Sequence, residues 1–135
     1  MVVTERRTSR DFAYRLQELV AVHFPTAERI RLVVDHLNIH TPAALYEVFP
    51  PAEARRLVCR IEFHYTPKHG SWLNMVEAEI AILSRQCLDR RLPTIEMLCA
   101  EIVAWEQERN LKQASVNWQF KTADARTKLK RLYPA

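Results

Sequence analysis

Glycine is almost absent from this sequence, with one residue, Gly70, among 135. Sheets built on tight hairpin turns usually need several glycines, so this scarcity argues against an all-β fold. Hydrophobic residues make up 48% of the chain, which is enough to bury a core at this length. Length and composition predict one domain, residues 1–135, in which helices dominate, and the order of helical and strand patterns described below predicts an α/β fold.

Cysteine pairs and long apolar runs are also missing. The three cysteines, Cys59, Cys87 and Cys99, are odd in number and have no CxxC spacing. We therefore expect reduced thiols in the core and no structural zinc. No stretch approaches the roughly 20 apolar residues of a membrane helix, so the sequence predicts a cytoplasmic protein.

The charge balance is weakly basic. Twenty Lys and Arg face sixteen Asp and Glu, which gives a net charge of +4. This excess suits a polyanionic partner such as DNA, but it equally suits an ordinary soluble protein. Charge alone leaves both interpretations open.

The first half of the chain alternates helical and strand patterns. A helix is predicted from the capping pair Thr8 and Asp11, and strands are predicted at about 30–35 and 60–65. Two short helical segments, "TPAALYEVF" and "PAEARRLV", separate the strands. The strands should therefore be parallel and joined by a helical crossover, with the leading "MVV" as the remnant of a third strand.

The second half is predicted to be helical. One helix starts near Leu73, another at Pro93 and Thr94, and a basic helix covers 122–132. The first of these carries an apolar stripe that is expected to be buried: Val76, Ile80, Leu83 and Cys87. Two or three strands make an incomplete sheet, which indicates that the chain is part of a larger assembly.

Asp35 ends an otherwise apolar strand. An ionised carboxylate there needs a cation, a crevice or a hydrogen-bond donor, and α/β sheets place their sites at this end of the strands. Asp35 is therefore a candidate functional acid. The alternative is that Asp35 only caps the turn that follows.

Glu77 and Glu79 cannot both face inward on one helix. Glu77 lies close to Leu73 and Ile80 around the helix, whereas Glu79 lies on another face. We expect Glu77 to border the buried stripe and Glu79 to point to solvent, with Asn74 capping the helix or orienting Glu77. Glu77 could also serve only as a negative charge near the helix N-terminus.

Polar residues crowd the segment "HYTPKHGSWLNMVEAEI", where Gly70 should allow a bend. Two acids brought together from a strand end and a helix supply the oxygen ligands that Mg²⁺ prefers. Lys68, His69, Ser71 and Trp72 offer donors and a stacking surface for a phosphate backbone. Taken separately, Trp72 could cover a core and Lys68 could be a solvated charge.

Three segments resemble the C-terminal part of insertion-sequence transposases of the DDE superfamily, related to the Tc/mariner group: "VVDHLNIH", "HYTPKHGSWLNMVEAEIAILSRQCLDRR" and "WQFKTADARTKLKRLYP". The resemblance implies a partial RNase H-like fold, Mg²⁺ (or Mn²⁺) as cofactor and DNA as partner. It implies that Asp35 and Glu77 are the second and third catalytic acids and metal ligands. The residues expected to contact DNA are His40, Lys68, His69, Ser71, Trp72, Asn74 and Arg85.

Two departures from the family pattern shape the functional prediction. The family's first acid has no counterpart here, because Asp11 falls in a helix, and the stretch between Asp35 and Glu77 is longer than in many relatives. We therefore expect a truncated or separately encoded half of a transposase that is inactive alone and that pairs with a second copy or an upstream half. The alternative is a noncatalytic module that binds DNA or protein through Lys121, Arg126, Lys128, Lys130 and Arg131.

Overall fold

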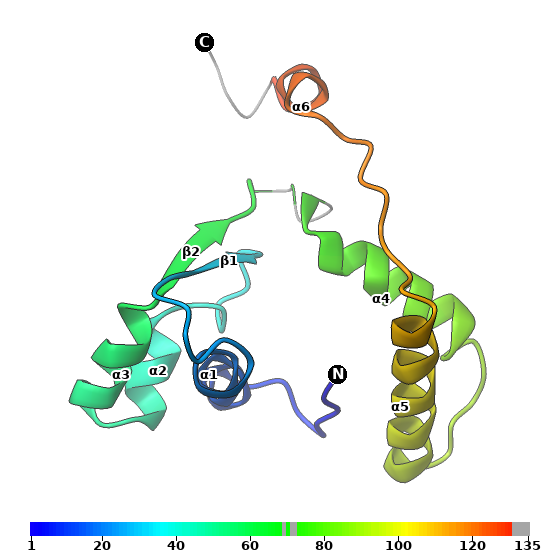
Figure 1. Ribbon diagram of the computed structural model, residues 1–135, viewed down its shortest axis with the longest axis horizontal. Helices are drawn as coiled ribbons and strands as arrows, with labels where there is room; N and C mark the ends of the chain where they lie inside the picture. The colour runs from blue at the N-terminus through cyan, green and yellow to red at the C-terminus, as the bar shows by residue number, and fades with distance from the viewer. Residues whose placement is uncertain (69, 71–72, 131–135) are drawn as a thin grey trace. The chain divides into compact units, whose positions relative to one another are not determined.

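The computed structural model describes residues 1–68, 70 and 73–130, and its elements divide into two compact units (Figure 1). The N-terminal unit is Thr4–Asn74, and the C-terminal unit is Met75–Ala135 together with Met1–Val3. About half of the chain is helical, and the described residues contain one two-stranded parallel sheet. The prediction of a mainly helical α/β chain is confirmed at this level.

The first helix of the N-terminal unit starts as its sequence predicts. In α1 (Ser9–Glu18) the Thr8 side chain accepts a hydrogen bond from the Asp11 amide, and the Asp11 carboxylate accepts one from the Thr8 amide. This capping box satisfies two amides that the helix leaves unpaired. The helix continues into a π-helical turn, η1 (Leu19–His23).

The two strands are parallel, as predicted. β1 (Ile30–Val34) pairs with β2 (Ile61–Tyr65), and the register sets Leu32 beside Phe63. The crossover between them consists of α2 (Ala43–Val48) and α3 (Pro51–Val58).

One hydrophobic core joins the sheet to three helices. In Figure 1, α1, α2 and α3 gather on one side of the strands. Leu32 and Phe63 pack against this core because register partners in a parallel pair point to the same face. The buried members of the core are Ala13, Leu16, Val20, Ala44, Leu45, Ala54, Leu57 and Ile61.

The C-terminal unit contains α4 (Met75–Gln86), α5 (Ile95–Leu111) and α6 (Thr122–Lys128). Leu83, Cys87 and Ile102 form its buried cluster. The Thr94 side chain caps α5 by accepting a hydrogen bond from the Met97 amide, as the sequence predicts. None of the described helices is long and apolar enough to cross a membrane.

Three sequence predictions are wrong in detail. The segment "MVV" forms no strand, and Val3 instead packs against the Leu83 cluster. Cys59 is exposed, because it follows the last turn of α3 and lies outside the core. On α4 only the second half of the predicted stripe is buried, and Val76 and Ile80 are 51% and 48% exposed. Periodicity places these side chains on one face of α4, but the apolar side chains of α5 cluster with Leu83 and Cys87 alone among them.

Candidate functional site

The carboxyl ends of β1 and β2 lie at the same edge of the sheet, because the strands are parallel. Asp35 follows β1 directly, and Tyr65 ends β2 in register with Val34. The Thr66 amide donates to the Val34 carbonyl at 2.9 Å, so the pairing extends to the last residue before Asp35. This edge therefore holds the Asp35 backbone in place.

One carboxylate oxygen of Asp35 is hydrogen-bonded within the protein. Oδ1 accepts a hydrogen bond from the Leu37 amide at 3.1 Å and lies 2.5 Å from Nδ1 of His40. Burial would raise the pKa of Asp35, but the Leu37 amide, the His40 ring and the positive charge of Arg7 hold that pKa below its ordinary value. Asp35 is therefore ionised at neutral pH, and its carboxylate can only accept hydrogen bonds.

His40 is held from three sides. Its ring packs against the Phe12 ring of α1 with centroids 4.8 Å apart, and its amide donates to the Leu37 carbonyl at 2.9 Å. Its carbonyl accepts a hydrogen bond from the Tyr65 hydroxyl at 2.9 Å. The His40 side chain is only 24% exposed. The resulting Asp35 cluster, defined as Asp35, His40, Tyr65 and Phe12, links the ends of both strands to α1.

The cluster bears on both interpretations of Asp35. The carboxylate does cap the turn that follows β1, as the alternative proposed. Capping uses only Oδ1, and Oδ2 receives no hydrogen bond from the residues that the structure describes. The side chain remains 33% exposed, so capping and a functional role are compatible.

Sequence reasoning did not find Tyr65 and Phe12 as parts of this cluster. The Tyr65 ring is exposed at the end of β2 and stacks on the His36 ring, with centroids 5.2 Å apart. The available signal was its position as the last residue of a strand parallel to the one that ends at Asp35.

The two glutamates of α4 differ from their predicted surroundings. Glu77 is exposed, whereas Glu79 is half-buried and accepts hydrogen bonds from Nη2 of Arg109 on α5 at 2.9 and 3.0 Å. The prediction that Glu79 points freely to solvent is therefore wrong. The reason is that α5 packs on the α4 face that carries Glu79, and periodicity could not identify that face.

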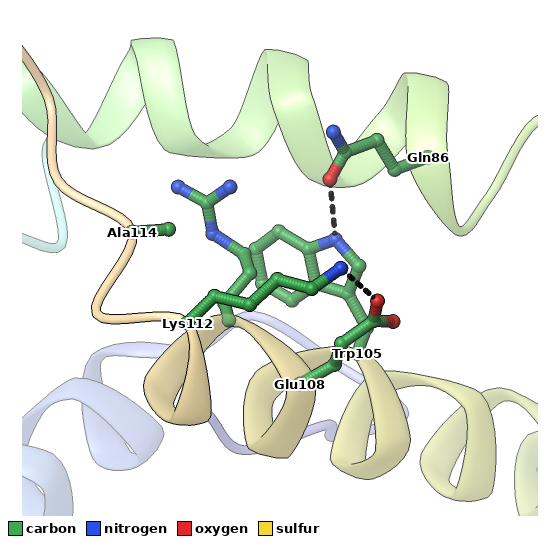
Figure 2. A pocket seen from close by; sticks show the side chains of 6 residues that line it. Gln86, Trp105, Glu108, Lys112 and Ala114 are labelled. Carbon is green, nitrogen blue, oxygen red and sulfur yellow. Dashed lines mark hydrogen bonds and ion pairs between the residues drawn. The ribbon is translucent and has the colours of Figure 1, made fainter.

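The same α4–α5 contact contains a pocket of about 240 Å³ (Figure 2). Trp105 donates its indole N–H to Oε1 of Gln86 at 3.0 Å, and the Arg109 guanidinium lies over the Trp105 ring at 5.0 Å. Lys112 pairs with Glu108 at the rim. The Lys112 pair lies at the C-terminal end of α5, whereas the bonds of Trp105 to Gln86 and of Arg109 to Glu79 hold α5 against α4.

The residues predicted to contact DNA are spread over the chain. Lys68 is exposed just after β2, Asn74 is half-buried, and Arg85 is exposed on α4 with Nε 3.4 Å from the Ala81 carbonyl. His69, Ser71 and Trp72 lie outside the described residues.

A turn ends at Gly70, whose amide donates to the Pro67 carbonyl at 2.7 Å. A Cβ at Gly70 would lie 3.0 Å from that same carbonyl oxygen, which explains why glycine suits this close approach.

The predicted metal ligands are single carboxylates, each of a kind that suits a hard cation. The described residues contain no group of three His, Cys, Asp or Glu side chains able to hold a metal. Asp35 offers one carboxylate oxygen in the N-terminal unit, and Glu77 offers an exposed carboxylate in the C-terminal unit. Their joint use as metal ligands stays a prediction.

Comparison with known proteins identifies the family. The family model described as DDE superfamily endonuclease matches residues 1–99, a range that includes both Asp35 and Glu77. No curated protein and no solved structure matches the chain. Because the family model covers well over half of the sequence, the chain belongs to the DDE superfamily endonuclease family.

Proposed function

We propose that the chain is part of the catalytic domain of a Tc/mariner-related insertion-sequence transposase, with a partial RNase H-like fold. Its parent reaction is metal-dependent phosphoryl transfer on DNA. The observation that carries the proposal is Asp35, an ionised carboxylate at the carboxyl end of a parallel strand and inside the family match. This is where α/β sheets place functional acids.

In this proposal Asp35 and Glu77 are the metal ligands contributed by this chain. Glu77 is exposed, and the carboxylate of Asp35 is in contact with His40. Bound Mg²⁺ or Mn²⁺ would supply activation of an attacking hydroxyl and neutralisation of charge on the phosphate. Lys68 and Arg85 are exposed cations suited to contacts with the DNA backbone.

Metal binding and DNA nicking test this function together. We expect Mn²⁺ to bind weakly to the 135-residue chain, and Asp35→Ala and Glu77→Ala each to weaken it further. The chain supplies two of the family's three acids, so we expect no nicking of supercoiled plasmid in Mg²⁺ above the level of Asp35→Ala. An Mn²⁺ affinity that neither substitution lowers would contradict the proposed ligands. Nicking that both substitutions abolish would contradict inactivity.

Association with a second copy or with an upstream half of the transposase belongs to the same proposal. Among the described residues each strand has one neighbour, so each also has an open edge. Open edges carry unpaired backbone groups that favour pairing with another chain. Light scattering should therefore detect a dimer or larger species, whereas a monomer with a cooperative melt would count against this association.

A noncatalytic DNA-binding module remains the second candidate. Lys121, Arg126 and Lys130 are exposed and lie beyond the family match, and Arg131 falls outside the described residues. Binding to duplex DNA that weakens with salt and survives Asp35→Ala combined with Glu77→Ala would favour the module. Binding that requires both carboxylates and a divalent metal would favour the catalytic fragment.

A further inference from the structure

His40, one of the residues expected to contact DNA, makes hydrogen bonds within the protein through its ring and its backbone. Asp35 is ionised and can only accept, so the 2.5 Å contact requires Nδ1 of His40 to carry the proton. Nδ1 is therefore occupied by Asp35 and is not available to a phosphate. The ring cannot turn away easily, because it is packed against Phe12.

The two carboxylate oxygens of Asp35 have different surroundings. Leu37 and His40 both act on Oδ1, whereas Oδ2 accepts no hydrogen bond within the described part of the chain. With only the Leu37 amide as donor, the plane of the carboxylate could tilt about its Cβ–Cγ bond. His40, as a second donor to the same oxygen, fixes that plane and therefore the direction in which the other oxygen points.

His40 is itself fixed by groups outside its own loop. The Tyr65 hydroxyl holds the His40 carbonyl from the end of β2, and Phe12 supports the ring from α1. The orientation of the Asp35 carboxylate is thus tied to the sheet and to a helix, which gives more rigid support than a loop alone.

We infer that His40 is a positioning residue: it holds Oδ1 of Asp35 so that Oδ2 is the oxygen presented to a hard divalent cation, and Tyr65 sets the position of His40. This inference rests on the proposed function, because it assumes that Asp35 is a metal ligand. Residues that orient metal ligands typically change metal affinity by about 10–100-fold when they are removed.

Paramagnetic broadening by Mn²⁺ tests the role on the 135-residue chain without any need for activity. The Leu37 amide is the reporter, since it donates to the same carboxylate. In His40→Ala we expect about 10-fold more Mn²⁺ to be needed for the same broadening. His40→Asn should stay within about 3-fold of wild type, because its Nδ2 can replace the Nδ1 donor.

Controls separate this role from loss of structure. His23→Ala removes an exposed histidine near Glu18 and should leave the Mn²⁺ midpoint unchanged. Thermal melts of all variants identify any that unfold. Tyr65→Phe removes only the hydroxyl and should shift the midpoint in the same direction as His40→Ala, but by less.

Two results would overturn the inference in distinguishable ways. If Asp35→Ala abolishes broadening while His40→Ala matches wild type, Asp35 is a ligand and His40 does not position it. If broadening is absent in wild type or unchanged in Asp35→Ala, Asp35 is not a ligand, and both the proposed metal role and the role of His40 fail.

Discussion

Nη2 of Arg109 lies between the two carboxylate oxygens of Glu79, at 2.9 and 3.0 Å. The pair joins α5 to α4, with the arginine side chain 18% and the glutamate side chain 32% exposed. Arg109 also covers the Trp105 ring. Glu79 therefore helps to hold the two helices together, whereas Glu77 on the same helix is exposed.

The first prediction compares these two glutamates. Glu79→Gln should lower the free energy of unfolding by about 1 kcal/mol, because a partly buried guanidinium loses its ionic partner. Glu77→Gln is the matched control and should change it by less than about 0.5 kcal/mol. Urea unfolding followed by circular dichroism measures both, and equal effects would show that the ion pair does not stabilise the helix contact.

The second prediction concerns Arg60, which precedes β2. Its guanidinium donates to the carbonyls of Phe24, Pro25 and Ala27, where the chain leaves η1. Arg60→Met keeps most of the apolar stem but removes the guanidinium as a donor to these carbonyls, so we expect a loss of about 1–2 kcal/mol in unfolding free energy.

Arg56→Met is the control for Arg60. Arg56 is exposed, and its Nη2 lies 3.9 Å from Oε1 of Glu53, so Arg56→Met should lower the free energy of unfolding by less than about 0.5 kcal/mol. A melt in which the two arginine variants are equally stable would contradict the capping role of Arg60.

The third prediction concerns the end of α5. Gln113 has a positive φ of 49°, and the Ala114 amide donates to the Arg109 carbonyl at 3.0 Å, as in a Schellman ending. Glycine adopts this conformation without steric cost, so Gln113→Gly should stabilise the chain by about 0.5–1 kcal/mol. Gln107→Gly, in the middle of the same helix, should instead destabilise it by a similar amount. Thermal melts should therefore move in opposite directions, and a shared direction would contradict the assigned ending.

The fourth prediction uses pH. The pKa of Asp35 is lower in the folded chain than its ordinary value of 3.8, so its charge stabilises the fold above that value. This contribution is lost as the pH falls through the folded pKa. Asp35→Asn should melt below wild type at pH 7, and the difference should shrink as the pH falls below 3.8.

Repeating the Asp35→Asn substitution in the His40→Ala variant identifies the cause of that pH dependence. In His40→Ala the carboxylate lacks one donor, so the pH-dependent part of the effect of Asp35→Asn should be smaller than it is in wild type. An effect of Asp35→Asn that stays constant with pH, or that is the same in both backgrounds, would contradict the assigned role of His40 in lowering the pKa of Asp35.

Local signals in the sequence determined the type and order of the elements. The Thr8 and Asp11 pair marks the start of α1, a β-branched run marks β1, alternating residues mark β2, and Thr94 marks the start of α5. Each signal acts over a few residues, because capping and strand alternation depend on neighbours along the chain. The same local reading placed Asp35 at the end of a strand.

The tertiary structure decided which surfaces and partners those elements use. Helical periodicity gives the angle between Glu77 and Glu79, but only packing against α5 selects Glu79 as the partner of Arg109. Likewise, Asp35 could have capped its turn alone, and its contact with His40 depends on support from Phe12 and Tyr65. These choices rest on contacts between residues distant in sequence, and their geometry is fixed only when helices and strands pack together.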